Sequence, residues 1–286
     1  MKTPFTELVG CRLPLQLAVL GGAGTTELAS AVAAAGGLAM VPGGVRPPTD
    51  PAPGASGIGF LMPFQPPPDV VARAASRARV VEFFYGEPRA ELASIVHAGG
   101  ALCAWQVGSA EEAEAAASAG CDFIVAQGIE AGGHVRGTAP VRDLLRAVLD
   151  TVHVPVVAAG GIATADDVAE VLALGSGAVR IGTRFVACEE SVAHPDYVAA
   201  LVAASGAADT VLTTHFSEGW PNAPHRVLKA AAAKAERTGN RSFTSPHRFE
   251  EGDVSDRAMY AGEGVGAVSG IVRAVDVVHE LMAPAL

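Results

Sequence analysis

Short apolar runs typical of buried strands alternate with segments of helical period along most of this chain. Eight runs are strand-like, at 16–20, 38–41, 58–62, 79–84, 102–107, 122–126, 154–158 and 178–181. Amphipathic segments follow most of them, at 25–35, 66–77, 88–98, 109–120, 141–152 and 164–175. Strands that alternate with helices form a parallel sheet, and eight such units make a (β/α)8 barrel. The sequence therefore predicts an α/β fold of the TIM-barrel type.

The regular alternation ends after the eighth predicted strand. Residues 188–259 contain two apolar, helix-like pieces at 197–204 and 227–235, and polar stretches at 219–225 and 238–256. Helical period returns at 264–281, which we expect to form the eighth outer helix. We therefore predict a barrel from residues 1–187 and 260–286, with a mostly helical insertion at 188–259. An insertion after strand eight lies on the active face of a barrel, where it would form a lid or a substrate wall.

Composition narrows the possible partners. Half of the 286 residues are apolar and the net charge is −10. The sequence has no basic cluster that could bind a phosphate backbone, so we do not expect nucleic acid as a partner. The four cysteines are far apart and the histidines do not cluster, so we expect no metal site, no disulfide and a reducing cytoplasmic location. The apolar stretch 13–41 is interrupted by glycine, threonine and glutamate, which excludes it as a membrane span. The Pro- and Gly-rich stretch 42–56 is predicted to be a loop.

The loop that follows the sixth predicted strand is Gln127-Gly-Ile-Glu-Ala-Gly-Gly-His134. It combines three glycines with an amide, a carboxylate and an imidazole. Glycines such as Gly132 and Gly133 allow backbone N–H groups to approach a ligand closely. An imidazole such as that of His134 can transfer protons near neutral pH. The loop therefore predicts a binding and catalytic segment at the carboxyl end of a strand.

Two further glycine turns follow the seventh and eighth predicted strands. They contain Gly160-Gly161 and Gly182-Thr183. In barrels, the loops after strands seven and eight often bind phosphate through backbone N–H groups. Each pair could also serve only to make a tight turn, but their occurrence together in this order favours a phosphate site.

Several side chains of these loops have two interpretations each. His134 is either catalytic or structural, and Glu130 either orients it or is solvated. Gln127 either hydrogen-bonds a polar ring or ties down its own loop, and Gln106 is a weaker candidate for contact with such a ring.

These motifs resemble the nitronate monooxygenase family, formerly called 2-nitropropane dioxygenases, which are FMN-dependent barrel enzymes related to FMN-dependent enoyl-acyl-carrier-protein reductases. The segment 127–134 is similar to the central motif of that family. The segments Val154-Pro-Val-Val-Ala-Ala-Gly-Gly-Ile-Ala-Thr164 and Val179-Arg-Ile-Gly-Thr-Arg-Phe185 are similar to its two phosphate-loop motifs. Weaker similarity extends over nearly the whole chain.

The resemblance implies FMN as cofactor, with Gln127 at the flavin ring and Gly160, Gly161, Gly182 and Thr183 at its phosphate. It implies that His134 acts beside the flavin, either by holding the oxygens of an anionic nitronate or by deprotonating a nitroalkane. The expected reaction uses O₂ and yields a carbonyl compound and nitrite. For the oligomeric state, our hypothesis is a homodimer.

Two positions depart from the family pattern. Ala18-Val19-Leu20 stands where the family usually has Ala-Pro-Met, and Gly59 stands where it usually has asparagine. Both positions lie near the flavin in the family, so they affect the expected choice of substrate and electron acceptor.

Three alternatives remain open from the sequence. The first is an NAD(P)H-dependent FMN reductase acting on a quinone or an enoyl thioester. The second is a flavin-binding or substrate-binding protein without turnover. The third is a flavin-free barrel enzyme whose glycine loops bind a phosphorylated substrate.

Overall fold

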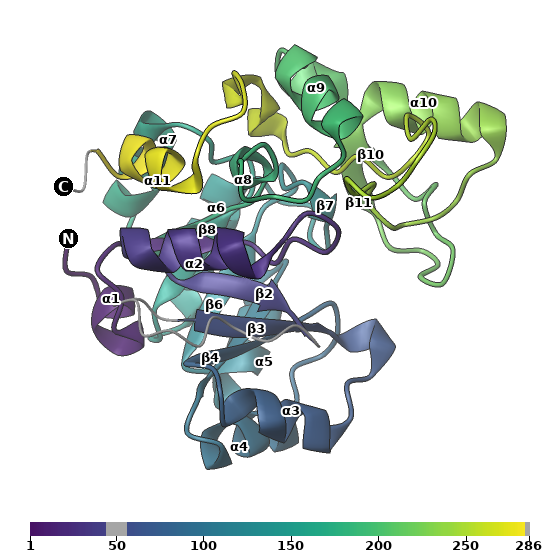
Figure 1. The fold of residues 1–286 in the computed structure, drawn as a ribbon. Coiled ribbons are helices and arrows are strands. Elements are labelled where there is room, and N and C mark those ends of the chain that lie inside the picture. Colours follow the sequence, from purple (N-terminus) through teal and green to yellow (C-terminus); the bar gives the residue numbers. More distant parts are fainter. Residues whose placement is uncertain (44–55, 284–286) are drawn as a thin grey trace.

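Eight parallel strands form a barrel in the computed structural model, which describes residues 1–43 and 56–283 (Figure 1). Their order is β1 (Leu15–Leu17), β9 (Ala178–Ile181), β8 (Val156–Ala159), β6 (Phe123–Gln127), β5 (Leu102–Val107), β4 (Val80–Phe84), β3 (Ser56–Leu61) and β2 (Ala39–Pro42). A parallel bridge from Gln16 to Leu38 links β1 to the start of β2. The predicted TIM barrel is therefore confirmed, and each predicted strand corresponds to one of these eight.

Helices cover the outside of the barrel. They are α2 (Thr26–Ala35), α3 (Pro68–Ala75), α4 (Ala90–Ala98), α5 (Ala110–Ser118), α6 (Val141–Thr151), α7 (Ala165–Ala173) and α11 (Ala274–Met282). Local signals set their ends: the Thr164 and Asp167 side chains form a capping box at the start of α7. Gly36, in a left-handed conformation, ends α2. Their apolar faces pack on the strands and form the main core.

The barrel interior is closed at its amino-terminal end by α1 (Pro4–Val9), a helix that the sequence did not predict. Phe5 of this helix packs edge-on against Phe123 of β6, with ring centroids 5.3 Å apart. Above Phe5 lies an apolar layer that includes Val80, Val125 and Val157. Because this end of the lumen is filled, a ligand can enter only from the carboxyl ends of the strands.

Residues 188–259 contain both helices and strands. The short α8 (Thr183–Val186) precedes this segment. The segment itself contains α9 (Pro195–Ala203), the 3₁₀ turn η2 (Ala207–Asp209), β10 (Thr210–Thr213), β11 (His225–Leu228) and α10 (Lys229–Thr238). β10 and β11 form an antiparallel sheet with the two-residue strand β7 (Gly133–His134) of loop 127–134. The stretch 227–235, predicted as helix, thus begins as a strand. In Figure 1 this segment lies beside the barrel, next to β7.

Two further local predictions differ from the structure. The first strand ends at Leu17, so Ala18, Val19 and Leu20 leave the sheet. The single helix predicted at 264–281 is wrong, because a 3₁₀ helix, η3 (Glu263–Ala267), is separated from α11 by an irregular stretch. A Cβ at Gly264 would lie 2.5 Å from the carbonyl oxygen of Gly161, so this stretch packs directly on a glycine turn.

The predicted loop 42–56 lies mostly outside the described residues. Another 3₁₀ turn, η1 (Met62–Phe64), follows β3.

No helix in the described parts of the chain combines the length and hydrophobicity needed to cross a bilayer. Within the same residues, no group of three or more His, Cys, Asp or Glu side chains is arranged to hold a metal ion.

Candidate active site

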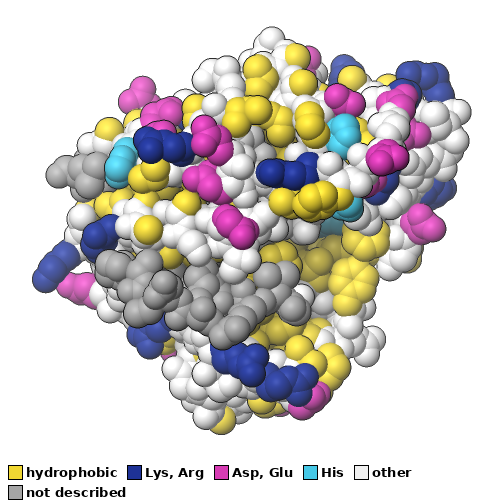
Figure 2. Space-filling model, viewed as in Figure 1, with side chains coloured by type: hydrophobic (Ala, Val, Ile, Leu, Met, Phe, Trp, Pro, Cys, Tyr) yellow, Lys and Arg dark blue, Asp and Glu magenta, His cyan; other side chains and the backbone are white. Residues whose placement is uncertain are grey.

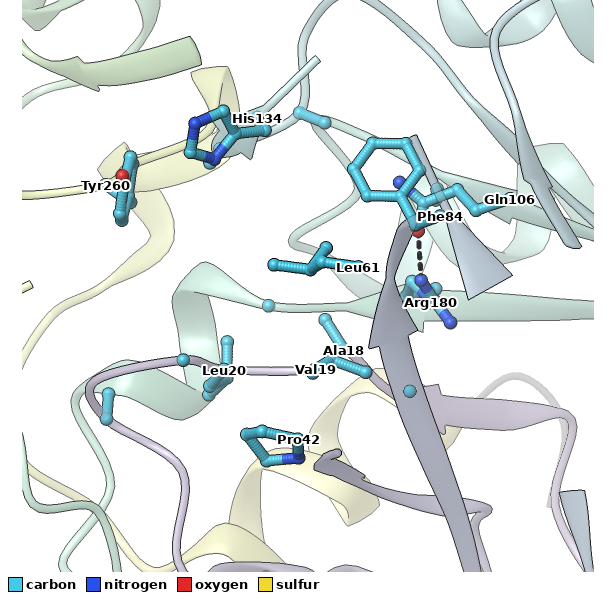
Figure 3. Close-up of a pocket in the computed structure, with 18 of the residues that line it drawn as sticks. Ala18, Val19, Leu20, Pro42, Leu61, Phe84, Gln106, His134, Arg180 and Tyr260 are labelled. Atoms are coloured by element: carbon cyan, nitrogen blue, oxygen red, sulfur yellow. Dashed lines mark hydrogen bonds between the residues drawn. The ribbon is translucent and has the colours of Figure 1, made fainter. Parts of the chain in front are cut away.

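A cavity of about 660 Å³ lies at the carboxyl ends of the barrel strands. This volume is within the range of roughly 300–1,000 Å³ that is usual for small-molecule and cofactor sites. Every site residue predicted from the sequence lines it: Gln127, Gly132, Gly133, His134, Gly160, Gly161, Gly182 and Thr183. In Figure 3, His134 and Tyr260 lie on one side of the cavity and Arg180 and Gln106 on the other. Figure 2 shows hydrophobic side chains gathered in a hollow of the molecular surface.

The two glycine turns meet at one edge of this cavity. Gly160 and Gly161 follow β8 and have φ angles of +112° and +70°, a region that favours glycine. A Cβ at Gly160 would also approach the Gly128 carbonyl oxygen to 3.0 Å, so the backbone here is closely packed. Gly182 and Thr183 follow β9 directly. The arrangement leaves backbone, rather than bulky side chains, at this edge.

Arg184 fixes the two turns relative to each other. Its buried guanidinium donates to the carbonyl oxygen of Ala163, 2.7 Å away in the loop after β8. It also pairs with Glu280 of α11, with an Nη2–Oε2 distance of 2.6 Å. Thr183 adds a further link, because its hydroxyl accepts from the backbone N–H of Gly262 at 3.0 Å. The glycine turns are therefore held in a defined geometry before any ligand binds.

Gln127 ends β6 and performs one of its two predicted tasks. Its amide Nε2 donates to the backbone carbonyl oxygen of His134 at 2.9 Å, so it does tie down its own loop. Its Oε1 is buried and has no hydrogen-bond partner among the described residues. A buried acceptor without a partner is costly. The orphaned oxygen of this cavity-lining residue therefore suits an N–H group of a bound ligand.

Glu130 does not orient His134, and it is not simply solvated. Its carboxylate accepts from the backbone N–H of Val141 at 2.9 Å, at the first residue of α6. A negative charge at a helix amino terminus is favourable because it satisfies free N–H groups and complements the helix dipole. Glu130 thus anchors loop 127–134 to the barrel.

His134 is enclosed by aromatic rings. It lies on β7, opposite His225 of β11. Its imidazole stacks on Trp220, with ring centroids 3.8 Å apart and an interplanar angle of 14°. The ring of Tyr260 lies 5.8 Å away. The Nε2 atom is buried and has no hydrogen-bond partner among the described residues.

This environment determines the protonation state of His134. Burial, helped by the neighbouring His225, lowers the pKa of His134 from 6.5 to about 3. Desolvation disfavours the charged imidazolium, and no carboxylate in the described structure pairs with the ring to offset it. His134 is therefore neutral at physiological pH, and its Nε2 has no hydrogen-bond partner among the described residues.

The cavity also contains residues that the sequence analysis missed. Trp220 and Phe243 come from segment 188–259 and Tyr260 follows it. Their proximity to His134 depends on contacts between distant parts of the chain, although Trp220 is one of only two tryptophans in the sequence. Arg180 and Glu82 were also missed. They could have been found as charged residues within strands that are otherwise apolar.

The two departures from the family pattern touch each other. Val19 and Gly59 both line the cavity. A Cβ built at Gly59 would lie 2.5 Å from Cγ2 of Val19, which is closer than real contacts allow. Valine has little freedom to move aside because its χ1 angle is restricted. The valine at 19 therefore requires a residue without a side chain at 59.

The fold and site together define a barrel enzyme with a preformed, cofactor-sized cavity, and comparison identifies its family. Residues 67–283 match the sequence model of the family described as nitronate monooxygenase. The chain belongs to this family and is an oxidoreductase of that type.

Individual relatives carry more than one name. The chain is 32% identical, over 84% of its length and 69% of the relative, to a (3aS,4S,5R,7aS)-5-hydroxy-7a-methyl-1-oxo-octahydro-1H-indene-4-carboxyl-CoA dehydrogenase of Rhodococcus jostii. It is 30% identical to a nitronate monooxygenase of Pseudomonas aeruginosa, over 82% of this chain and 83% of that one.

Solved structures agree with the fold throughout the chain. FabK from Thermotoga maritima superimposes with a TM-score of 0.84 and 28% identity, covering 99% of this chain and 96% of that one. A nitroalkane oxidase from Streptomyces ansochromogenes gives a TM-score of 0.79 and 28% identity, covering 98% and 97%.

The lowered pKa of His134 predicts a specific loss of stability in acid. Between pH 6.5 and about 3 the unfolded chain binds a proton at this residue and the folded chain does not, so stability falls as pH falls. Between pH 7 and 5, the free energy of unfolding of the unmodified protein should fall by roughly 2 kcal/mol more than that of His134→Phe. Chemical denaturation at both pH values measures this difference, and equal losses would contradict the neutral, buried imidazole.

The contact between Val19 and Gly59 predicts compensation between two substitutions. Gly59→Ala alone should reduce the free energy of unfolding by about 1–3 kcal/mol, because it overpacks the site. Adding Val19→Ala should restore most of that loss, since the clashing methyl group is removed. A double-mutant cycle by urea denaturation tests this. Additive losses in the double variant would show that the two positions do not share this space.

Proposed function

We propose that this protein binds FMN and oxidises nitroalkanes and nitronates with O₂, yielding a carbonyl compound and nitrite. The observation that carries the proposal is the desolvated His134, with an unpartnered Nε2, in the same cavity as two preformed glycine turns. Membership of the nitronate monooxygenase family and the likeness to a nitroalkane oxidase support it.

The residues of the cavity fit FMN. The backbone N–H groups at Gly160, Gly161, Gly182 and Thr183 would hold its phosphate, an arrangement common at these two barrel loops. The orphaned Oε1 of Gln127 would accept an N–H of the ring, with Gly132 and Gly133 allowing close approach. When bound, FMN supplies the electron transfer from substrate to O₂, and the protein supplies orientation and electrostatics.

His134 would act as the base for a neutral nitroalkane. Its Nε2 takes the proton from the carbon next to the nitro group, the C–H bond breaks, and the electron pair stays on the resulting nitronate. The proton remains on the imidazole, where its charge balances that of the anion. Stacking on Trp220 holds the ring in place and excludes water from it. A nitronate added directly would not need this proton transfer.

Segment 188–259 would form the wall of the substrate site in this proposal. It contributes Trp220 and Phe243 to the cavity, and the pairing of β7 with β11 joins it to the loop of His134. The apolar character of these side chains suits the hydrocarbon part of a neutral substrate. We therefore propose the division into a barrel at 1–187 and 260–286 and an inserted wall at 188–259.

A second candidate is an NAD(P)H-dependent FMN reductase acting on a quinone or an enoyl thioester. The name of the Rhodococcus relative, a carboxyl-CoA dehydrogenase, is the observation that favours a thioester substrate. Both candidates use the same flavin site and differ in what reduces the flavin.

Anaerobic mixing of the FMN-loaded protein with a small nitroalkane, and separately with its nitronate, tests the proposal. Both should bleach the flavin absorbance without a nicotinamide. In His134→Asn, bleaching by the nitroalkane should slow by at least about tenfold, because general-base catalysis contributes that much or more. Bleaching by the nitronate should change little, so it serves as the control within the same variant.

Other outcomes would contradict the proposal. Bleaching by NADPH or NADH and by neither nitro compound would identify a reductase. Equal slowing for nitroalkane and nitronate would remove His134 from proton transfer. Failure to bind FMN would overturn the assignment of the glycine turns.

A further inference from the structure

A charged cluster crosses the barrel lumen beneath the cavity. Arg180 of β9 and Glu82 of β4 form an ion pair in which the arginine side chain is 7% exposed and the glutamate 2%. Gln16 of β1 donates its Nε2 to Glu82 at 3.1 Å and accepts from Nε of Arg180 at 3.2 Å. Arg180 also donates to Oε1 of Gln106 on β5. Four strands thus contribute one connected polar layer.

The strand order shows that this layer spans the barrel. β9 and β4 are separated by β8, β6 and β5 on one side and by β1, β2 and β3 on the other. They therefore lie on opposite sides of the lumen. Beneath the pair is the apolar layer closed by Phe5 of α1. Arg180, Glu82 and Gln106 line the cavity itself, so the cluster forms its floor. Figure 3 shows the hydrogen bond between Arg180 and Gln106.

Stability alone does not explain a buried ion pair at this place. Desolvating two charges is costly, and apolar residues of similar volume often serve as well or better. By contrast, α1 packs its Phe5 on the apolar side chains Phe123, Val125 and Val157. A charge pair at the floor of a cofactor cavity does act on whatever is bound above it, because electrostatic interactions are strong where water is excluded.

We propose that the Arg180–Glu82 pair sets the electron affinity of the flavin bound in this cavity. This inference rests on the proposed FMN site. Reduction adds negative charge to the flavin, so the guanidinium favours the reduced form and the carboxylate opposes it. Both side chains line the cavity, and hydrogen bonds from Arg180 to Gln16 and Gln106 hold the guanidinium in position. Both are positioning and tuning residues for the cofactor.

Substitutions that remove one charge at a time test the proposal, because they should act in opposite directions. The probe is sulfite, which adds reversibly to oxidised flavin and gives it negative charge, measured by bleaching at equilibrium on FMN-loaded protein. Glu82→Gln should bind sulfite at least about tenfold more tightly, and Arg180→Gln at least about tenfold more weakly. The flavin reduction potential should rise in the first variant and fall in the second.

Two double variants distinguish an effect of charge on the flavin from an effect on the stability of the fold. Removing one member of a buried pair can destabilise the chain strongly. We therefore also compare Arg180→Lys/Glu82→Gln with Arg180→Gln/Glu82→Gln, which differ by one positive charge. The lysine form should bind sulfite at least about tenfold more tightly.

Two results would contradict the proposed role of the Arg180–Glu82 pair. Shifts in the same direction in both single variants, or equal sulfite affinities in the two double variants, would show that the cluster only supports the barrel. These readouts do not involve a nitro compound. A protein that binds FMN, shows the opposing shifts and fails to oxidise nitroalkanes would therefore contradict the proposed function and leave this inference intact. A protein that cannot bind FMN would overturn both.

Discussion

A two-residue strand, β7, pairs antiparallel with β11 and joins loop 127–134 of the barrel to segment 188–259. This pairing places the imidazole of His134 against Trp220 and beside His225. The resulting desolvation lowers the pKa of His134 far below its ordinary value. The protonation state that the proposed chemistry requires is thus a consequence of how an inserted segment pairs with one barrel loop.

The cavity has three chemically different sides. Around His134 it is aromatic and without charge, whereas its floor contains the Arg180–Glu82 pair. The glycine turns after β8 and β9 leave a third edge formed by backbone. A neutral imidazole on one side and fixed charges on another fit the proposal that different residues serve proton transfer and electron transfer. This division is compatible with the family to which the chain belongs.

The sequence predicted the barrel and the gathering of its glycine loops because both follow from local patterns. Strand runs, helix periods and loops at strand ends are encoded within about ten to twenty residues, and a closed barrel brings equivalent loops to one rim. The contact of Val19 with Gly59, the stacking of Trp220 on His134 and the Arg180–Glu82 pair are non-local. Their partners are separated by many residues, so no local pattern reveals them. The split of the predicted last helix has the same origin, since Gly264 is fixed by its contact with the turn at Gly161.

A crystal structure of the protein with FMN would test the proposed cofactor site. We expect the phosphate against the backbone of Gly160, Gly161, Gly182 and Thr183, with an N–H of the ring at Oε1 of Gln127. We also expect the ring between His134 on one side of the cavity and the Arg180–Glu82 floor on the other. A phosphate bound elsewhere, or a ring that contacts neither His134 nor the floor, would contradict it.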